Sequence, residues 1–581
     1  MFIRVKSTPN SPRKSVQIVH SQRVGSKVKQ KIIKHVGIAF DDKELEELKA
    51  MANAMKVELE LQEQLPLYTP QEIESLALKA QEESKKRSLS KKDTTATEIN
   101  REDYEVNLLD LLEEDRVIKG VHEIYGKLYD ELNFKSVVPN ASRHQAASKA
   151  LKEIVLARIA NPDSKSGSVD MLASKFGVNL NLKTVYRMMD MIDDKQIKKL
   201  NTLVLTKTKK LLDNKIDVIY FDATTLYFES FNEDVDSDEE AIRKNGYSKD
   251  GKFNQPQVVL ALLVTKQGLP IGYKAFSGDT FDGHTLIPSL KEIENEFKVD
   301  NIVYVADAGM FNKTNLSEFN KDDNKNMSYI VGAKIKTMSQ EIKKQIVNKE
   351  DMQDINDDTK VKTLEYQGKK LLISYSKKRA KKDKFERKKA IAKLKKRLES
   401  SKSVKSQLSN SGYKKYLQLE SSENTQSTCD LSIALNEEKI KEDEAWDGLK
   451  GILTNNTTLS NEELIHQYTN LWQVEESFRI TKHDLKIRPI YHWKPSRVKA
   501  HLAISFMAYT LVRHLEYRVR LQYKKLSPQK IKNILLSVQS SILYDTKTDR
   551  KFSLPSRVSL DAKKIYNLME VNIVTKPSIL K

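Results

Sequence analysis

Three carboxylates, each next to or within an expected secondary-structure element, are the side chains best suited to chemistry. The apolar run 216–221 is followed by Asp222, and the run 301–306 is followed by Asp307. Both runs have the β-branched and aromatic content of buried strands, and ligands collect where the strands of an open sheet end. Glu475 is the third carboxylate, on an expected helix. Three oxygen ligands on separate elements suit Mg²⁺ or Mn²⁺.

The helix that carries Glu475 follows from the spacing of its apolar residues. A carboxylate that faces a protein interior costs several kcal/mol unless a cation compensates it, and Arg479, Lys482 or a divalent ion would do so here. The alternative is an ordinary intrahelical ion pair between Glu475 and Arg479, worth about 0.3 to 0.5 kcal/mol on an exposed surface. Steps of three or four residues connect one helical face: Leu464, Tyr468, Leu471, Trp472, Glu475, Phe478, Arg479, Lys482 and Leu485.

Each aspartate taken alone would be read as a turn or cap residue, and it is the combination of two such strands with the helical Glu475 that favours a metal site. Asp279, Asp282 and His284 compete as metal ligands, but the Gly-Asp and Asp-Gly pairs around them are typical of turns, and we leave these three residues out of the site. The acidic segment 232–240 lacks the central Gly and the terminal Glu of a calcium-binding loop and is expected to be a solvated loop.

The order of the three carboxylates, with Tyr468 before and Lys482 after Glu475, resembles the DDE transposases of bacterial insertion sequences. The resemblance is to the group with a Tyr-Arg-Glu-Lys signature, although Leu471 stands where that signature has Arg. It covers roughly 216–515, with an interruption, and is specific because several motifs occur in one order. Three further segments match: 305–310, 329–334 and 488–492.

The resemblance implies metal-dependent phosphoryl transfer on DNA. Asp222, Asp307 and Glu475 would be the catalytic residues and the ligands of two Mg²⁺ ions, which sit about 3.5 to 4 Å apart in sites of this kind and which Mn²⁺ can replace. One site would then nick DNA, form and open hairpins, and join the ends to a target, which is cut-and-paste movement of an insertion sequence. The alternatives are a Mg²⁺-dependent DNA nuclease on the same core and a catalytically inactive DNA-binding relative.

The resemblance also implies DNA contacts beside the metals. Tyr468, Arg479 and Lys482 would hold phosphates, and Arg479 or Arg488 would supply the charge that Leu471 lacks. Trp446 is a candidate for stacking on a flipped base, and ordinary packing is the alternative. The expected partners are the terminal repeats of the element and the target DNA, bound by a homodimer in the synaptic complex.

Composition agrees with a nucleic-acid partner. The 581 residues include 100 Lys and Arg against 80 Asp and Glu, a formal charge of +20, which attracts polyanions. No apolar stretch reaches the roughly 18 residues of a membrane span, and 502–512 is expected to be a buried core helix. The N-terminus lacks the apolar block of a signal peptide. Cys429 is the only cysteine, which excludes disulfides within the chain and fits a reducing bacterial cytoplasm, where the protein would associate with the nucleoid.

The expected fold class is α/β: an RNase H-like catalytic core with an insertion between its last strand and the Glu-bearing helix. A basic β-ribbon and a helical DNA-binding region precede this core. The ribbon contains no Asp or Glu, which favours phosphate contacts over a merely solvated sheet edge. The expected parts are 1–40, the ribbon; 41–210, helical, with a charged linker near 83–103; 211–334, the first part of the core; 335–460, the insertion; 461–520, the second part of the core; and 521–581, a C-terminal region.

Several elements are expected within these parts. The segment 169–190 reads as two helices around a Gly-containing turn, a pair that would place Lys183, Tyr186 and Arg187 in a DNA groove, although such hairpins are common in other proteins. The run 377–397 is dominated by Lys and Arg and is expected to be a solvated helix or a DNA clamp. The expected strands are 216–221, 224–229, 256–265, 269–276, 301–306 and 446–454.

Overall fold

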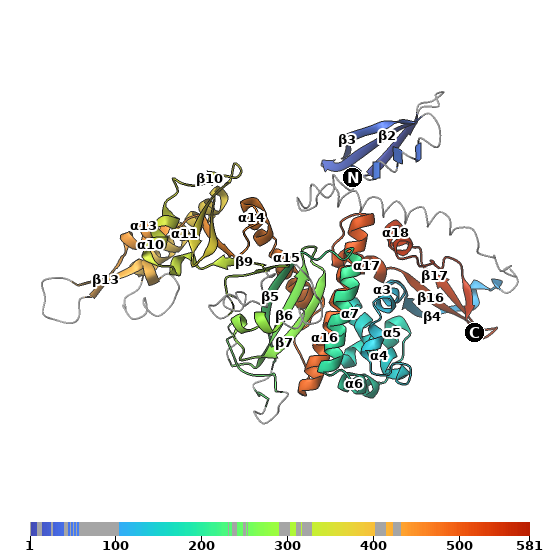
Figure 1. Ribbon diagram of the computed structural model, residues 1–581. Coiled ribbons are helices and arrows are strands. Elements are labelled where there is room, and N and C mark those ends of the chain that lie inside the picture. The colour runs from blue at the N-terminus through green and yellow to red at the C-terminus, as the bar shows by residue number, and fades with distance from the viewer. Residues whose placement is uncertain are drawn as a thin grey trace.

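A mixed sheet runs through the centre of the computed structural model, with helices packed beside it (Figure 1). In its middle part the strand order is β7-β6-β5-β8-β9. Strand β6 runs antiparallel to β5 and β7, whereas β8 and β9 run parallel to β5. These strands are β5 (Val218–Tyr227), β6 (Gln257–Thr265), β7 (Pro270–Ser277), β8 (Val303–Ala306) and β9 (Ser328–Ala333).

The structure describes most of the chain. The expected linker 83–103, the greater part of the acidic segment 232–240 and Cys429 lie outside the described residues. The described residues are 2–7, 14–24, 27–39, 45–46, 48–49, 52–53, 55–56, 104–229, 232–234, 241–247, 251, 254–289, 302–309, 315, 328–400, 414–421 and 431–580.

The middle strands are buried on both faces. Every residue of β6 is buried, as expected for a continuous apolar run inside a sheet that is covered on both sides. Along β5, Val218 and Tyr220 enter one apolar core, while Ile219 and Phe221 enter the other. This alternation follows from the two-residue period of a strand. The sheet therefore separates two cores and fixes which side chains face each of them.

The prediction that one strand ends at Asp222 and a second begins at Thr224 is wrong. Strand β5 is continuous from Val218 to Tyr227, and Asp222 lies in its middle. The reason is β6, which pairs with β5 along its whole length, including Asp222 opposite Leu262. A strand that has a partner of sufficient length on one side does not have to stop where its partner on the other side stops.

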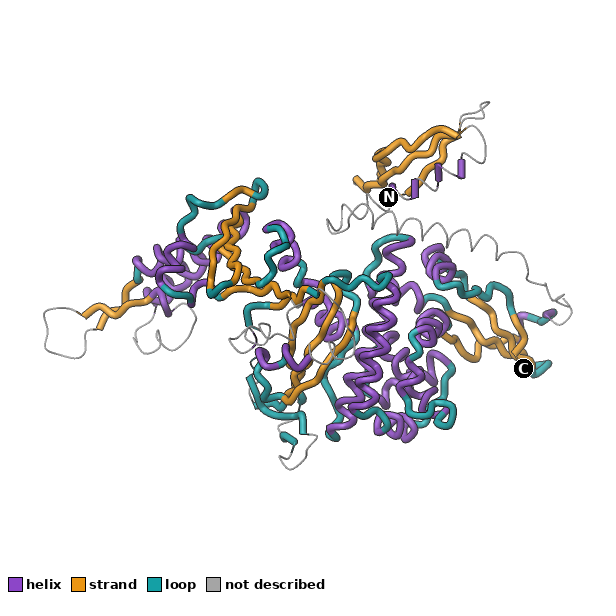
Figure 2. The backbone as a smooth tube through the Cα atoms, viewed as in Figure 1, coloured by secondary structure: helices purple, strands orange, loops and turns teal. Residues whose placement is uncertain are grey.

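The segment 335–460 continues the same sheet outward, as Figure 2 shows. Its strands follow β9 in the order β15-β12-β11-β10. The basic run forms a helix, α11 (Lys377–Ser400), as one of the two alternatives predicted. The strand expected from Trp446 begins only at Leu449, because Trp446 caps the preceding helix α13. The elements are α10 (Gln340–Val347), β10 (Gln353–Asp354), β11 (Thr359–Tyr366), β12 (Lys369–Ser376), β13 (Leu417–Ser421), β14 (Leu431–Leu435), α13 (Glu437–Ala445) and β15 (Leu449–Thr454).

A group of helices packs beside the sheet, around the long helix α16 (Figure 1). Helix α16 is buried along most of its length and contains the expected core segment 502–512. The two helices expected within 169–190 are confirmed: α5 ends at Gly177, whose φ of 64° is the left-handed conformation of a C-cap glycine, and α6 is capped by Asn181. The helices are α3 (Gly120–Glu131), α4 (Gln145–Ala160), α5 (Lys165–Phe176), α6 (Leu182–Asp190), α7 (Asp194–Leu211), α16 (Pro495–Gln522), α17 (Pro528–Leu536) and α18 (Leu560–Leu568).

One strand interrupts the region expected to be helical. Residues Leu111–Ile118 form β4, which pairs with β16 from the C-terminal region. Over so short a stretch, the apolar spacing after Leu108 fits both the helical period and the two-residue period of a strand. Pairing with the distant strand β16 therefore decides that this segment is a strand. This second sheet has the order β18-β17-β16-β4 and contains β16 (Gln539–Asp545), β17 (Arg550–Pro555) and β18 (Ser578–Leu580).

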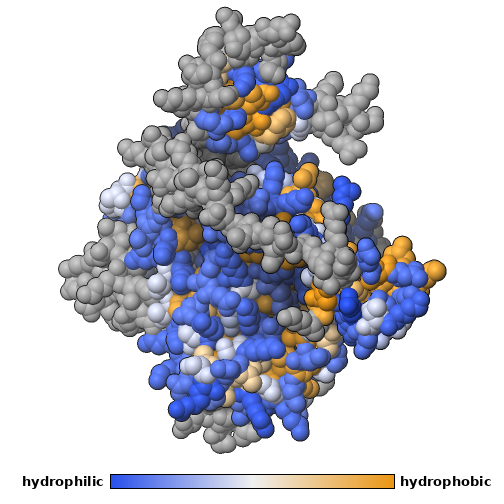
Figure 3. Space-filling view, turned by 90° about the vertical axis from the view of Figure 1, so that its right-hand side faces the viewer, coloured by the Kyte–Doolittle hydropathy of each residue, from blue (hydrophilic) through white to orange (hydrophobic). Residues whose placement is uncertain are grey.

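The basic N-terminal segment forms strands, as predicted. The three strands make an antiparallel sheet of their own, in the order β1-β2-β3. Over the described part of the chain, no helix combines the length and the apolar character needed to cross a membrane. The face of the molecule in Figure 3 is mostly hydrophilic, in keeping with the high content of charged residues. The strands are β1 (Phe2–Ser7), β2 (Lys14–Val24) and β3 (Lys27–Ala39).

Buried histidines make the fold sensitive to acid. His514 of α16 is buried against Thr208 of α7, with 3.0 Å between Nε2 and Oγ1, and burial lowers the pKa of His514 to about 3. The unfolded chain takes up this proton near pH 6.5, whereas the native state does not. Native stability therefore falls as the pH drops from about 6.5 toward 3, by about 1.4 kcal/mol per pH unit for this group.

We expect His514→Gln to reduce this loss. Urea unfolding at pH 7 and pH 5 should show a smaller difference between the two pH values for the variant than for the unsubstituted protein. Replacing the exposed His284 by Gln should leave the difference unchanged. A pH dependence that is identical in His514→Gln and in the unsubstituted protein would contradict the assignment.

Candidate active site

Sheet register brings Asp222 and Asp307 side by side. The parallel ladder between β5 and β8 pairs Tyr220 with Val305 and ends at Phe221 opposite Ala306. Each aspartate is the next residue on its strand, and adjacent strands lie about 4.8 Å apart. Tyr220 and Val305, which lie two residues before Asp222 and Asp307, belong to the same core. Because side chains two residues apart on a strand share a face, both aspartates face the same side of the sheet.

The expected Glu-bearing helix covers that same side. It is divided into α14 (Asn461–Thr469) and α15 (Trp472–Arg479), followed by a π-helical turn (Ile480–Asp484). Helix α14 packs against β8 and β9, and α15 packs against β5 and β6. The hydroxyl of Tyr468, near the end of α14, donates a hydrogen bond to Asp307 Oδ1 at 3.4 Å. This contact fixes the start of the Glu-bearing segment directly over the second aspartate.

Close packing under Tyr468 requires a glycine. A Cβ at Gly332 of β9 would overlap the Tyr468 hydroxyl. The motif 329–334 on this strand therefore has a physical role, because it lets the tyrosine reach across β9 to the end of β8.

The structure leaves the Glu475 side chain exposed, contrary to the expectation that it faces the interior. The buried face of α15 is formed by Gln473, Val474, Ser477 and Phe478, and Glu475 lies outside that face. Its charge nevertheless acts on the same tyrosine as that of Asp307: burial raises the pKa of Tyr468, and the charges of both Asp307 and Glu475 raise it further. The same two charges act on Lys450.

The donor set suits a hard divalent cation. Asp307 is exposed and Asp222 is half-buried, so water and ions have access to both. Within the described residues, neither Asp307 nor Glu475 forms an ion pair with a basic side chain, which leaves their charges uncompensated. No three His, Cys, Asp or Glu side chains among the described residues are grouped closely enough to hold a metal ion as they stand. The residue types fit Mg²⁺ or Mn²⁺, while the ligand geometry is not preformed.

The proposed phosphate ligands lie in different surroundings. Lys482 donates a hydrogen bond to Thr224 Oγ1, and Thr224 is on the same face of β5 as Asp222. Arg479 does not pair with Glu475; its guanidinium binds Glu476 at 2.7 and 2.6 Å and lies 3.7 Å from Asp484. Its charge is thus already balanced by protein carboxylates.

Two positions that the sequence singled out are partly or wholly buried. Leu471, in place of the signature Arg, is buried in the core beneath the helices. Trp446 is half-buried and packs against the second core, with Lys336 Nζ 5.7 Å from the centre of its ring. The packing interpretation of Trp446 accounts for these contacts.

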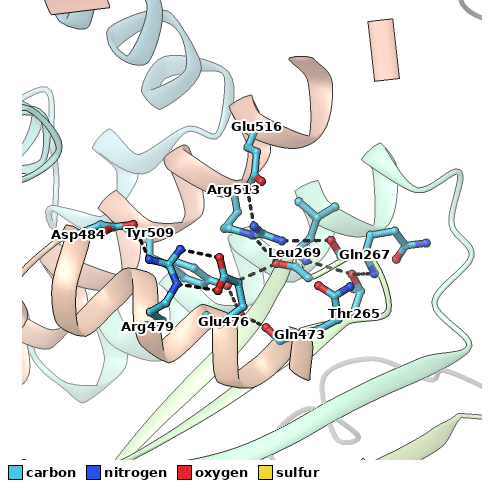
Figure 4. Close-up of polar contacts among 12 residues, drawn as sticks. Thr265, Gln267, Leu269, Gln473, Glu476, Arg479, Asp484, Tyr509, Arg513 and Glu516 are labelled. Atoms are coloured by element: carbon cyan, nitrogen blue, oxygen red, sulfur yellow. Dashed lines mark hydrogen bonds and ion pairs between the residues drawn. The ribbon is translucent and has the colours of Figure 1, made fainter. Parts of the chain in front are cut away.

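A polar network holds the opposite face of α15, as Figure 4 shows. Arg513 of α16 donates to the carbonyl oxygens of Gly268 at 2.9 Å and Gln267 at 3.3 Å, in the turn between β6 and β7, and pairs with Glu516. Tyr509 donates to Ser477 of α15 at 2.5 Å. The network fixes α15 between α16 and the β6–β7 turn, and thereby fixes the direction of Glu475.

Sequence reasoning missed this network. It predicted the strands 256–265 and 269–276 on either side of this turn but not the arginine that binds the turn, because no local pattern connects residues so far apart. Gly268 has a φ of 75°, and a Cβ there would overlap the Arg513 guanidinium and lie 2.6 Å from Gln473 Oε1. Only the glycine allows the turn and the helix to approach.

The helical region anchors the chain just after the π-helical turn. Arg158 of α4 donates to the carbonyl oxygens of Leu485 at 3.3 Å and Lys486 at 3.0 Å. His501 of α16 bonds to the carbonyl oxygen of Ile487 at 3.0 Å. The Glu-bearing segment is therefore held at both of its ends.

Two known protein families match parts of this chain. The family described as "Transposase DDE domain" matches residues 213–511, slightly more than half of the chain and inclusive of all three carboxylates. The family described as "IS1634 family transposase, N-terminal domain" matches residues 3–64. Among curated proteins, none matches the chain.

One solved structure that matches is described as "Mos1 transposase paired-end complex with left transposon end". It is 11% identical, with a TM-score of 0.13, and the match covers 29% of this chain and 53% of that one. The chain thus spans about half the length of that transposase.

Proposed function

Because the chain belongs to the DDE transposases, with an N-terminal segment similar to that of the IS1634 family, we propose that it moves an insertion sequence by cut-and-paste transposition. The reaction is metal-dependent DNA strand cleavage followed by strand transfer, and Asp222, Asp307 and Glu475 are its catalytic carboxylates. One observation carries the assignment: the two aspartates directly follow the last pair of the parallel β5–β8 ladder, and Tyr468 of the Glu-bearing segment bonds to one of them.

The core of this enzyme is RNase H-like. The strand order β7-β6-β5-β8-β9, in which β6 alone runs opposite to the others, supports this fold. Helix α15, which carries Glu475, packs against β5 and β6 of that core. The segment 335–460 enters between the last core strand and the Glu-bearing helix.

The three carboxylates would hold Mg²⁺, with Mn²⁺ as a substitute. Such ions, when bound, polarise phosphoryl oxygens and lower the pKa of an attacking water or 3′-hydroxyl. Tyr468 orients Asp307 through its hydrogen bond, and Lys482 lies beside Asp222 through Thr224. The network behind α15 keeps Glu475 directed to the same place. The residues of this chain thus position the ligands and leave the open side of the site to DNA.

The DNA contacts follow from the charges around the site. Tyr468, Glu475 and Lys482 belong to the Tyr-Arg-Glu-Lys group, with Leu471 in place of the Arg. Tyr468 and Lys482 contact backbone phosphates, Arg479 contributes chiefly by holding α15, and Trp446 lies farther out as a stacking candidate. Lys183 and Arg187 of α6 are exposed and, with the basic N-terminal sheet, bind the terminal repeats. A homodimer joins the two ends in the synaptic complex, in the bacterial cytoplasm at the nucleoid.

The test is a strand-cleavage assay on labelled duplexes that carry the ends of the element. In Mg²⁺ we expect nicked ends and their joining to a plasmid, and we expect both products to vanish when EDTA removes the metal. Cleavage without any joining would favour the nuclease. Specific binding of the ends without cleavage in Mg²⁺ or Mn²⁺ would favour the inactive DNA-binding relative.

A further inference from the structure

We propose that Lys450 of β15 is a phosphate-binding residue of the DNA site, assisted by Arg379 at the start of the basic helix α11. The proposal rests on the proposed function, because the phosphate belongs to the DNA strand that enters beside Asp307 and Glu475. In this proposal, two basic residues of the segment 335–460 supply the positive charge that an Arg at position 471 would supply.

The position of Lys450 is set by the sheet. Strand β15 pairs with β9, which in turn pairs with β8, the strand that ends at Asp307. Lys450 lies two residues before Ile452, whose side chain enters the core beneath α14, so Lys450 faces the same side of the sheet as both aspartates. Its Nζ lies 4.3 Å from the centre of the Tyr468 ring. The ammonium thus rests on the tyrosine whose hydroxyl bonds to Asp307.

Lys450 lacks the partner that a half-buried ammonium normally requires. Within the described residues it forms no ion pair with a carboxylate, and its side chain is partly withdrawn from water. The face of a tyrosine compensates only part of the lost hydration of a cation. Burial lowers the pKa of Lys450, the charge of Arg379 lowers it further, and the charges of Asp307 and Glu475 oppose this effect. An oxygen anion beside Lys450 would complete its coordination, and a DNA phosphate is the anion that this site receives.

Arg379 brings a second positive charge to the same place. It lies in the first turn of α11, which follows β12 without a loop, and its charge acts on both Lys450 and Tyr468. Its guanidinium is half-exposed and lies 3.7 Å from Asp383, so it can turn toward an incoming phosphate. A DNA strand that passes the three carboxylates therefore meets two cations from the segment 335–460.

The two cations are held in a fixed relation. Asp383 of α11 accepts a hydrogen bond at 3.0 Å from the backbone nitrogen of Gly448, two residues before Lys450. Arg387 of the same helix pairs with Asp447, with 2.7 Å between Nη2 and Oδ2. Helix α11 and the start of β15 are therefore one structural unit, and the basic helix has a defined orientation to the active site.

The experiment measures how binding of an element-end duplex depends on salt, with Ca²⁺ in place of Mg²⁺ to suppress cleavage. Each phosphate contact contributes about 0.9 to the slope of log K against log salt concentration. We expect Lys450→Met to reduce the slope by about this amount, Lys450→Arg to restore it, and Lys450→Met with Arg379→Met to reduce it further. The matched control is Lys441→Met, an exposed lysine on α13 of the same segment, which should leave the slope unchanged.

Cleavage in Mg²⁺ provides the second readout. We expect Lys450→Met to cut about 10- to 100-fold more slowly than the unsubstituted protein at saturating DNA, as for the loss of a charged hydrogen bond to the reacting strand. An unchanged salt slope with unchanged cleavage would overturn the proposal, and so would a lowered melting temperature with an unchanged slope, which would show that Lys450 only packs on Tyr468. If the unsubstituted protein binds the ends but does not cleave them, the proposed function fails, while the salt slopes still decide the role of Lys450.

Discussion

Asp222→Asn is expected to lower the rate of DNA strand cleavage at least about 10³-fold while leaving the binding of element-end DNA intact. The loss corresponds to several kcal/mol of transition-state stabilisation, the magnitude expected when a metal ligand of a phosphoryl-transfer site is removed. Binding should persist because the amide preserves the shape of β5, and because the substitution removes no positive charge. Asp307→Asn should behave in the same way, since the two residues end one parallel ladder.

The matched control for this prediction is Asp217→Asn. Asp217 directly precedes β5, at the end of the strand away from the site, and pairs with Lys266 at 2.7 Å, with its own side chain largely exposed. The Lys266 side chain is buried, so its pairing with Asp217 contributes to stability, but the pair lies outside the site. Cleavage per folded molecule should therefore remain within a few-fold of the unsubstituted rate. Single-turnover cleavage of a labelled duplex and a gel-shift titration measure the two quantities. Full cleavage by Asp222→Asn in Mg²⁺ would remove the metal-ligand role.

The second large effect is expected at Arg513. Arg513→Met should lower the free energy of unfolding by about 3 to 5 kcal/mol, because it leaves Glu516 without its buried partner and two carbonyl oxygens of the β6–β7 turn without a donor. Because the same network holds α15, cleavage by the fraction that remains folded should also fall. Urea unfolding followed by circular dichroism measures the first effect, and cleavage per folded molecule measures the second.

Two further variants separate this role from a general effect of altering α16. Arg520→Met changes an arginine on the same helix whose guanidinium lies over the Tyr517 ring at 5.2 Å, and it should cost no more than about 1 kcal/mol. Gly268→Ala leaves Arg513 in place but inserts a Cβ against its guanidinium at a positive φ, and should cost about 1 to 3 kcal/mol. Equal stability of Arg513→Met and Arg520→Met would show that the network does not hold the helix.

The amino-acid sequence by itself determined the local elements and singled out the three carboxylates that we propose as catalytic residues. Strand β6 and helix α16 follow from apolar runs of the right length, and α5 and α6 follow from a glycine and an asparagine at their ends. Such signals act between residues a few positions apart, so they can be read along the chain. The spacing around Glu475 likewise indicated the family, because motif order is a property of the sequence alone.

Only the tertiary structure decided how these elements meet. The continuation of β5 through Asp222, the strand β4 in a region expected to be helical, and the extension of the central sheet into 335–460 all depend on partners far away in sequence. A pairing register is set by the match of two distant surfaces, and a pattern within one strand does not contain it.

The contacts of the charged side chains were likewise decided by the tertiary structure and not by the sequence. Helical spacing in the sequence placed Arg479 near Glu475. In the structure Arg479 pairs with Glu476 and Asp484 instead. The cation that contacts Tyr468 is Lys450. A long basic side chain binds the carboxylate or ring that the fold presents to it, and helical spacing limits only its neighbours on the same helix. The proposed catalytic carboxylates could thus be identified from the sequence, whereas the residues proposed to orient them could be identified only from the packing of β9, β15, α15 and α16.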